Sequence, residues 1–268
     1  MLKYLKKSGK KTAKNEESEM NFLDHLEELR WHVIRSLLAI TVVAIGVFMS
    51  KTFVFETIIF GPKNDWFPTY KYLGIKAAKF DILPREMGES FFTHIKVSAI
   101  LGLIIVFPYV FWEFWKFIRP GLYETEKKAA RGIVFICSML FLIGILFGYY
   151  VIAPVAVTFL ASYSVGIDAI NSPTLASYVS TLTMCTLPTG LVFELPIIVY
   201  FLAKIGLVSG ASMKKYRKHS VIVILMFAAI ITPPDVVSQF LIGIPIYILF
   251  EISIIIAGRV EKNKAKEE

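Results

Sequence analysis

Two glutamates could bind a cationic ligand, because neither has a lysine or arginine close to it on its own helix. Glu28 lies in His-Leu-Glu-Glu-Leu-Arg (25–30), and Glu126 lies in Arg-Pro-Gly-Leu-Tyr-Glu-Thr-Glu-Lys-Lys (119–128). Side chains three and four residues apart are neighbours in a helix, and neither glutamate meets a lysine or arginine at those spacings. Two such carboxylates in a basic part of the chain predict a receptor for guanidinium groups. The alternative is a pair of ordinary solvated surface acids.

The composition indicates a membrane protein. Hydrophobic residues make up 56% of the 268 residues, and the mean hydropathy is +0.62; soluble domains have about 45–50% apolar residues. The net charge of +8 could suggest nucleic acid. However, the basic residues form short clusters between long apolar runs, which is how membrane loops distribute charge. We therefore expect no nucleic-acid binding.

Six apolar runs predict an all-α integral membrane protein with six transmembrane helices. A span needs about 20 residues to cross a hydrocarbon core of about 30 Å. The fifth run is bounded by Lys218 and Pro233, and the sixth by Val236 and Glu251, so we expect both spans to be short. Short spans thin the bilayer or are shielded by a neighbouring subunit. The six runs are 33–49, 95–112, 133–153, 178–203, 221–231 and 236–257.

The distribution of lysine and arginine predicts that both termini are cytoplasmic. Basic residues are frequent in both tails and in the second and fourth loops, but segments 153–177 and 232–238 have none, and such residues favour the cytoplasmic side. We expect a disordered basic tail over 1–20, which anionic lipid would attract. The six-span domain would cover 21–258, and a charged tail 259–268.

The first external loop, residues 51–90, is the exception to this charge rule, because it also contains lysines and one arginine. Its length and its prolines predict an outer cap made of short helical pieces. Aromatic side chains are typical of the membrane–water interface, so we expect that location for those of the cap, which are Trp66, Phe67, Tyr70 and Tyr72.

Several motifs occur together in one order, and with them the chain resembles the TatC family, the multi-spanning receptor subunit of the twin-arginine protein translocase. The resemblance runs from about residue 22 to residue 257 and implies a concave, glove-like bundle. It rests on His-Leu-Glu-Glu-Leu-Arg before the first span, Ser-Phe-Phe-Thr-His-Ile-Lys (90–96), Phe-Pro (107–108), Trp-Lys-Phe-Ile-Arg-Pro-Gly-Leu-Tyr-Glu-Thr-Glu (115–126), Phe-Glu-Leu-Pro (193–196), Thr-Pro-Pro-Asp-Val-Val-Ser-Gln (232–239) and Pro-Ile-Tyr-Ile-Leu-Phe-Glu (245–251).

The resemblance implies that Glu28 and Glu126 bind the paired arginines of the signal peptide on folded export cargo. A carboxylate can accept two parallel hydrogen bonds from one guanidinium. Where the family often has a basic residue two places after Arg30, this chain has His32, which carries no permanent charge. The resemblance also implies neighbours for this patch, which are Arg30, Phe117, Leu122 and Tyr123.

The resemblance further implies partners and an energy source. The partners would be single-span subunits of the TatA and TatB type and other copies of the chain, in the bacterial cytoplasmic (inner) membrane. Transport would be driven by the proton motive force.

Glu194 is expected inside the fourth span, where a carboxylate is costly and marks a functional site by default. The resemblance implies a polar contact with the partner subunits or the transported chain; the alternative is a protonated glutamate bonded to a neighbouring helix.

Asp235 could cap the sixth helix, with Gln239 one turn on, and the resemblance makes this hairpin part of the partner-binding region. Tyr149 would be a polar group on the third span. The resemblance places Pro62 and Phe91 in the outer cap.

No motif indicates an enzyme. The phosphate-binding pattern Gly-x4-Gly-Lys-Ser/Thr, His-Glu-x-x-His and Gly-x-Ser-x-Gly are all absent from the sequence, and the four histidines have no metal-ligand spacing. Cys137 and Cys185 fall within spans, so we expect no metal and no cofactor. The main alternative to a translocase receptor is a secondary transporter that uses Glu194 as a proton site, and the third is a membrane scaffold.

Gly144 and Gly148 form Gly-x-x-x-Gly, which allows close helix packing.

Overall fold

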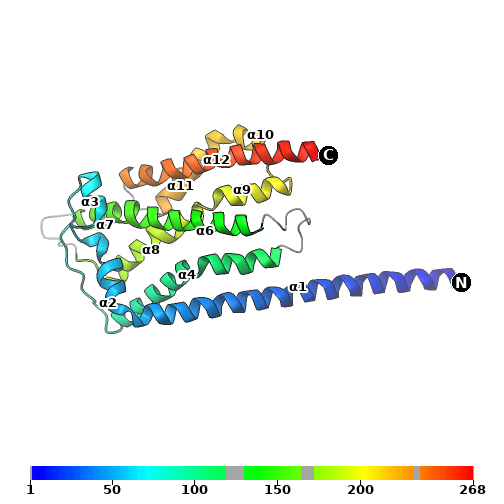
Figure 1. Cartoon of the computed structure of the whole chain (residues 1–268), viewed down its shortest axis with the longest axis horizontal. Helices are drawn as coiled ribbons and strands as arrows, with labels where there is room; N and C mark the ends of the chain where they lie inside the picture. The colour runs from blue at the N-terminus through cyan, green and yellow to red at the C-terminus, as the bar shows by residue number, and fades with distance from the viewer. Residues whose placement is uncertain (1, 119–129, 164–171, 232–235, 268) are drawn as a thin grey trace.

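The chain folds into a bundle of long helices capped at one end by short ones. The computed structural model describes residues 2–118, 130–163, 172–231 and 236–267, and side chains within 26–117, 132–163, 172–231 and 239–264. The long helices run along one axis, and Figure 1 shows that α1 begins and α12 ends at the same end of the bundle. The described residues contain helices and no strand, as the composition predicted.

Five described segments are long and apolar enough to cross a membrane. The first is residues 26–49 of α1 (Leu2–Met49), and the second lies in α4 (Glu89–Ile118). The other three are formed by α6 (Ala130–Phe147) with η4 (Gly148–Ile152) and α7 (Ala153–Ser162), by α8 (Leu175–Val192) with α9 (Leu195–Lys204), and by α12 (Val236–Glu267).

The predicted fifth span is short, but the sixth is not. Helix α11 (Arg217–Ile231) has only 15 residues. Helix α12 has 32 residues, and its apolar segment runs from Gln239 to Lys264. Our expectation that the sixth span is short was wrong, because this apolar segment of 26 residues continues past Glu251. Arg217 of α11 pairs with the Glu251 carboxylate at 2.5 Å. A paired acid costs less inside an apolar helix, so Glu251 does not end the span.

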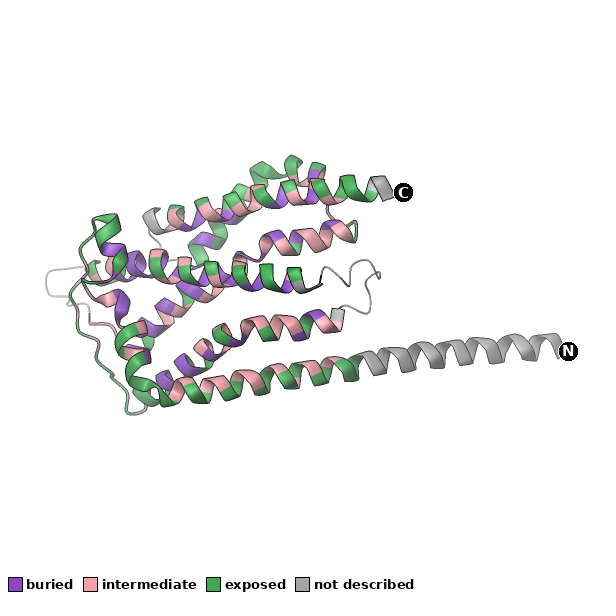
Figure 2. Ribbon diagram, viewed as in Figure 1, coloured by how far each residue is buried: buried purple, intermediate pink, exposed green. Residues whose placement is uncertain are grey.

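Helix α1 lies at the edge of the bundle. None of its residues from 26 to 49 is buried, and its partner is α4 (Figure 2). An apolar helix that is exposed in the protein alone is suited to contact with lipid. The residues 2–20, for which we expect a disordered tail, are helical in the structure as the first part of α1. The boundary proposed at residue 20 stays a prediction.

Residues 51–73 form short helical pieces, as predicted. These are α2 (Lys51–Phe53), η1 (Val54–Ile59), η2 (Gly61–Lys63) and α3 (Pro68–Leu73). The cap aromatics divide into two sets, which the interface prediction did not foresee. Trp66 and Tyr72 are exposed, whereas Phe67 and Tyr70 are buried and pack beneath the cap, Phe67 against the ring of Tyr150 at 5.3 Å.

The Gly-x-x-x-Gly pair packs α6 and η4 directly onto α8. A Cβ atom on Gly144 would lie 2.8 Å from the Cα of Gly190, and one on Gly148 would lie 2.5 Å from the carbonyl oxygen of Cys185. Such separations are below any van der Waals contact, so only glycine fits. The packing interpretation of this motif is confirmed.

A buried carboxylate joins the first turn of α4 to the start of α8. Oε1 of Glu89 accepts a hydrogen bond of 2.7 Å from the backbone N–H of Ala176, in the first turn of α8. Oε2 accepts bonds from the N–H groups of Arg85 and Glu86, at 2.7 and 3.3 Å. The carboxylate therefore satisfies three backbone donors and faces the positive end of the α8 dipole.

We expect Glu89→Ala to lower the melting temperature of the detergent-solubilised protein, because three backbone donors lose their acceptor. Glu89→Gln keeps one acceptor oxygen and should lower it less. Glu86→Ala is the matched control, since the Glu86 side chain is exposed and only its backbone N–H takes part. A melting temperature unchanged in Glu89→Ala would contradict this role for the carboxylate.

Candidate functional site

Glu28 lies on the described part of α1, near the end of the bundle where the two tails begin. Its side chain is 50% exposed, and Oε1 lies 4.0 Å from Nε2 of His32 on the next turn. Thus Glu28 has an imidazole beside it, and it takes part in at least one further interaction. The half-exposed carboxylate therefore lies at the surface of the bundle, beside an imidazole.

A second carboxylate, Glu113 on α4, holds this histidine from the other side. Oε2 of Glu113 lies 2.6 Å from Nδ1 of His32, and Oε1 accepts a bond of 2.9 Å from Nζ of Lys116. Glu113 is only 2% exposed, whereas Lys116 is 40% exposed. The contact joins α1 to α4 and orients the imidazole. We call Glu28, His32, Glu113 and Lys116 the carboxylate–histidine cluster.

Glu113 was missed from the sequence, because it follows the apolar run 95–112 and reads as the residue that ends it. The signal that could have found it is the lysine three residues later, in Glu-Phe-Trp-Lys (113–116). An acid within an apolar helix and next to a basic residue at this spacing is typical of an internal ion pair.

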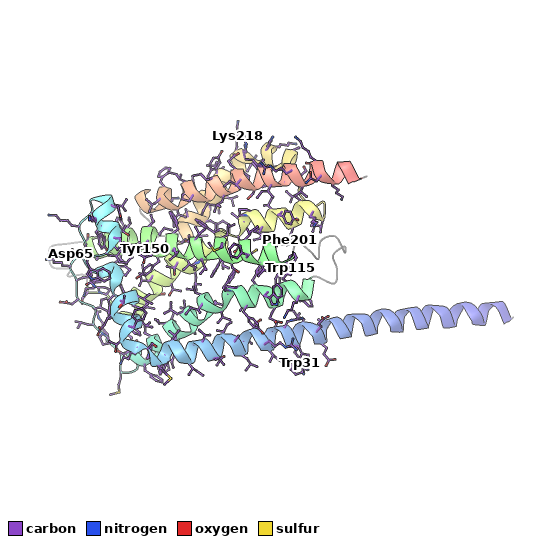
Figure 3. The ribbon with its side chains drawn as sticks, viewed as in Figure 1. Trp31, Asp65, Trp115, Tyr150, Phe201 and Lys218 are labelled. Atoms are coloured by element: carbon purple, nitrogen blue, oxygen red, sulfur yellow. The ribbon has the colours of Figure 1, made fainter. Side chains whose placement is uncertain are left out.

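Aromatic side chains lie on the helices that carry the cluster, and one of them contacts it. The ring of Phe117 meets that of His32 edge-on at 6.4 Å, and the Arg30 guanidinium lies 5.8 Å from the ring centre of Trp31. Trp115 is buried on α4 and packs against Phe201 of α9, with ring centres 5.2 Å apart and ring planes tilted by 42°. Figure 3 labels both side chains, together with Trp31 on α1. Of the predicted patch, Glu28 and Arg30 thus lie at the start of the apolar segment 26–49 of α1, and Phe117 lies at the end of α4.

Four predicted site residues lie outside the residues that the structure describes. They are Glu126, Leu122, Tyr123 and Asp235. The distance between the two glutamates of the predicted receptor is therefore not part of the described geometry, and the roles of these four residues stay predictions.

Glu194 is buried at a break between two helices. Helix α8 ends at Val192 and α9 begins at Leu195, because Pro196 has no N–H to donate to the Val192 carbonyl. The side chain is 7% exposed and lies near Cys137 and the Phe141 backbone on α6. Neither of its oxygens forms a hydrogen bond with the described residues. Its role, as a contact for partner subunits or the transported chain or as a protonated acid bonded to a neighbouring helix, stays a prediction.

The other predicted polar and cap residues have defined contacts within the chain. Tyr149 donates to the Ile58 carbonyl at 2.6 Å, which fixes the cap to the third span. Nε2 of Gln239 donates to the Leu225 carbonyl of α11 at 3.0 Å. Pro62 is buried, and its carbonyl accepts a bond from the Tyr70 hydroxyl. Phe91, by contrast, is 59% exposed on α4, and of these four side chains it alone is exposed.

Comparisons with known proteins identify the family. The family model described as "Sec-independent protein translocase protein (TatC)" matches residues 24–245. A TatC protein of Blattabacterium sp. subsp. Periplaneta americana is 37% identical over 265 residues, which cover 94% of this chain and 100% of the relative. One from Helicobacter pylori strain 26695 is 39% identical over 236 residues, which cover 88% and 87%.

Solved structures of TatC proteins have the same fold. Two crystal structures of a twin-arginine translocase receptor, TatC, superpose with TM-scores of 0.68 and 0.69 at 31% and 32% identity. They cover 87% and 86% of this chain, and the matches extend over 97% and 98% of the solved chains. The helical membrane fold, the motifs and these matches together establish that the chain belongs to the TatC family of Sec-independent protein translocase proteins.

Proposed function

We propose that this chain is the receptor that binds twin-arginine signal peptides for the translocase. What carries the proposal is the half-exposed carboxylate of Glu28, placed next to a histidine that the buried Glu113 holds in position. Because the imidazole is already bonded to Glu113, it competes weakly with an incoming guanidinium for Glu28. An arginine can bind a carboxylate through two parallel hydrogen bonds, which a lysine cannot do.

The second arginine of the signal would bind Glu126. Phe117 and Leu122 would then supply apolar contact to the residues that follow the arginines, with Arg30 and Tyr123 beside them. These roles rest on the position of the motifs within the family.

Single-span partner subunits would assemble on the outer face of the bundle, and the proton motive force would drive transport. An apolar groove of about 660 Å³ supports this part of the proposal. It lies between the α8–α9 segment and α11, and its wall includes Leu191, Ile198 and Phe227, which are about half exposed. An apolar helix of a partner would cover these side chains, and Glu194 at the α8–α9 break would lie close to it.

The direct test is the affinity of a fluorescent signal peptide for the purified full-length chain. We expect Glu28→Gln to weaken binding of an Arg-Arg peptide by roughly thirtyfold, or about 2 kcal/mol, because a charged hydrogen-bonded pair is lost. Glu126→Gln should have a similar effect. A Lys-Lys peptide should bind weakly to every form.

Glu27→Gln is the matched control, because Glu27 is exposed and adjacent to Glu28 in the chain. It removes the same charge from the same turn of α1, so it should leave the affinity for the Arg-Arg peptide nearly unchanged. Equal weakening by Glu27→Gln and Glu28→Gln would mean that the peptide senses only surface charge. If all variants bind the Arg-Arg peptide with the same affinity, Glu28 is an ordinary surface acid.

A further inference from the structure

A groove between α10 (Gly210–Lys215) and α12 has the features of a binding site for an anion. Its volume is about 770 Å³. Four basic residues line it, together with two acids, Glu251 and Glu261. The basic residues are Lys214, Arg217, Arg259 and Lys262. We call this feature the α10–α12 groove, and Figure 1 shows both helices side by side at the end of the bundle where the chain ends.

Close backbone contact sets the position of the two helices. A Cβ atom on Gly210 would lie 3.0 Å from the Cα and N atoms of Gly258. Ser209 caps α10 through a reciprocal pair of bonds with Ser212, so the helix begins at a fixed point beside Gly258. A Cβ atom on Gly258 itself would meet nothing within 4 Å, which means that the space beside it is open. The groove is therefore built by the packing of two helices.

The charges of the groove are only partly neutralised within the chain. Arg217 pairs with Glu251 at 2.5 Å, and the Tyr247 hydroxyl also donates to Glu251 at 3.0 Å. Lys214, Arg259 and Lys262 are exposed, and in the described part of the chain none of them forms an ion pair. Four basic residues against two acids leave the groove with two excess positive charges.

An apolar stripe leads from the middle of α12 directly into this charged region. Ile248, Ile252 and Ile255 are 53%, 43% and 55% exposed, and they lie four and then three residues apart. Arg259 follows four residues later, and Lys262 three residues after that. These spacings put all five side chains on one face of the helix. In the membrane-spanning segment such a face meets lipid tails, and its charged end meets the head groups.

We propose that the α10–α12 groove binds the phosphate of an anionic phospholipid, with one acyl chain along the isoleucine stripe of α12. Lys214, Arg259 and Lys262 bind the phosphate oxygens, and the isoleucines bind the chain. Basic pockets between helices at the membrane surface select anionic head groups over neutral ones. A free phosphate ion satisfies the same cations but makes no use of the isoleucines, so the apolar stripe favours the lipid.

The test uses the purified full-length chain and measures bound lipid by native mass spectrometry, with phosphatidylglycerol and phosphatidylcholine of equal chain length. We expect phosphatidylglycerol to bind and phosphatidylcholine to bind much more weakly. Lys214→Gln combined with Arg259→Gln should weaken phosphatidylglycerol binding by roughly tenfold. Lys215→Gln combined with Lys218→Gln is the matched control, because these exposed lysines are close in sequence but do not line the groove.

Three results would overturn the proposal. Equal loss in both double variants would mean attraction by surface charge alone. Competition by millimolar inorganic phosphate, with the same affinity as a short-chain phosphatidylglycerol, would mean an anion site with no role for the acyl chain. Equal binding of both lipids by the wild type would mean no selection of charge. If the Lys214→Gln and Arg259→Gln double variant does not fold, Lys262→Gln replaces it, since Lys262 is exposed near the end of α12. We then expect a smaller loss of phosphatidylglycerol binding.

Discussion

Replacing Glu113 with alanine is expected to lower the free energy of unfolding by about 3 kcal/mol. The carboxylate is 2% exposed and bonds both His32 and Lys116. Removing one partner of a buried pair leaves the other unpaired and costs about 3–5 kcal/mol. We expect the lower end of this range, because Lys116 is 40% exposed and can hydrogen-bond to water once Glu113 is gone. The His32 side chain is 11% exposed and loses its partner without such a replacement. Denaturation of the detergent-solubilised protein with SDS measures the change.

Two further variants separate the buried charge from the loss of a side chain. Glu113→Gln keeps the shape and one acceptor for His32, so it should cost about 1 kcal/mol. Glu27→Ala removes an exposed acid from α1 and should be nearly neutral. If Glu113→Ala were as stable as Glu27→Ala, the cluster would contribute nothing to the joining of α1 and α4. If folded Glu113→Ala protein also binds the Arg-Arg peptide more weakly than the wild type, this would support a role for His32 in orienting Glu28.

Replacing Gly148 with valine is expected to lower the free energy of unfolding by at least about 2 kcal/mol or to prevent folding. The first added carbon would lie 2.5 Å from the Cys185 carbonyl oxygen and 2.8 Å from the Cα of Thr186. Both atoms belong to the backbone of α8, so no side-chain rotation can relieve the contact. Overpacking of this kind forces the backbone to shift. The melting temperature and the monodisperse fraction in detergent measure the effect.

Gly132→Ala is the control, because it adds a carbon to the same apolar segment, in α6, at a position with nothing within 4 Å. There the substitution should be neutral or slightly stabilising, since alanine favours a helix by about 1 kcal/mol relative to glycine. Gly148→Ala should be intermediate between Gly132→Ala and Gly148→Val. Melting temperatures that are equal for Gly132→Ala and Gly148→Val would contradict the close packing of η4 on α8.

The sequence determined the helical membrane fold, because long apolar runs have few stable alternatives in a bilayer. Five of the six predicted spans coincide with described helical segments of sufficient length, and the remaining one, the fifth, coincides with the short α11. The order of the motifs determined the family, and the position of Glu28 at the start of the apolar segment of α1 followed from the first predicted span. The Gly-x-x-x-Gly spacing correctly indicated close packing, although not the helix against which it packs.

Only the tertiary structure decided which charges meet. Glu113 and His32 are 81 positions apart, and no spacing rule within one helix joins them. The same reason explains the error at Glu251, whose partner Arg217 lies 34 positions away on another helix, and the division of the cap aromatics into buried and exposed. A local pattern reports which face of a helix is apolar, but the neighbour that this face meets depends on how the helices pack. Whether an acid ends a span or remains inside it therefore depends on a partner that only the folded chain supplies.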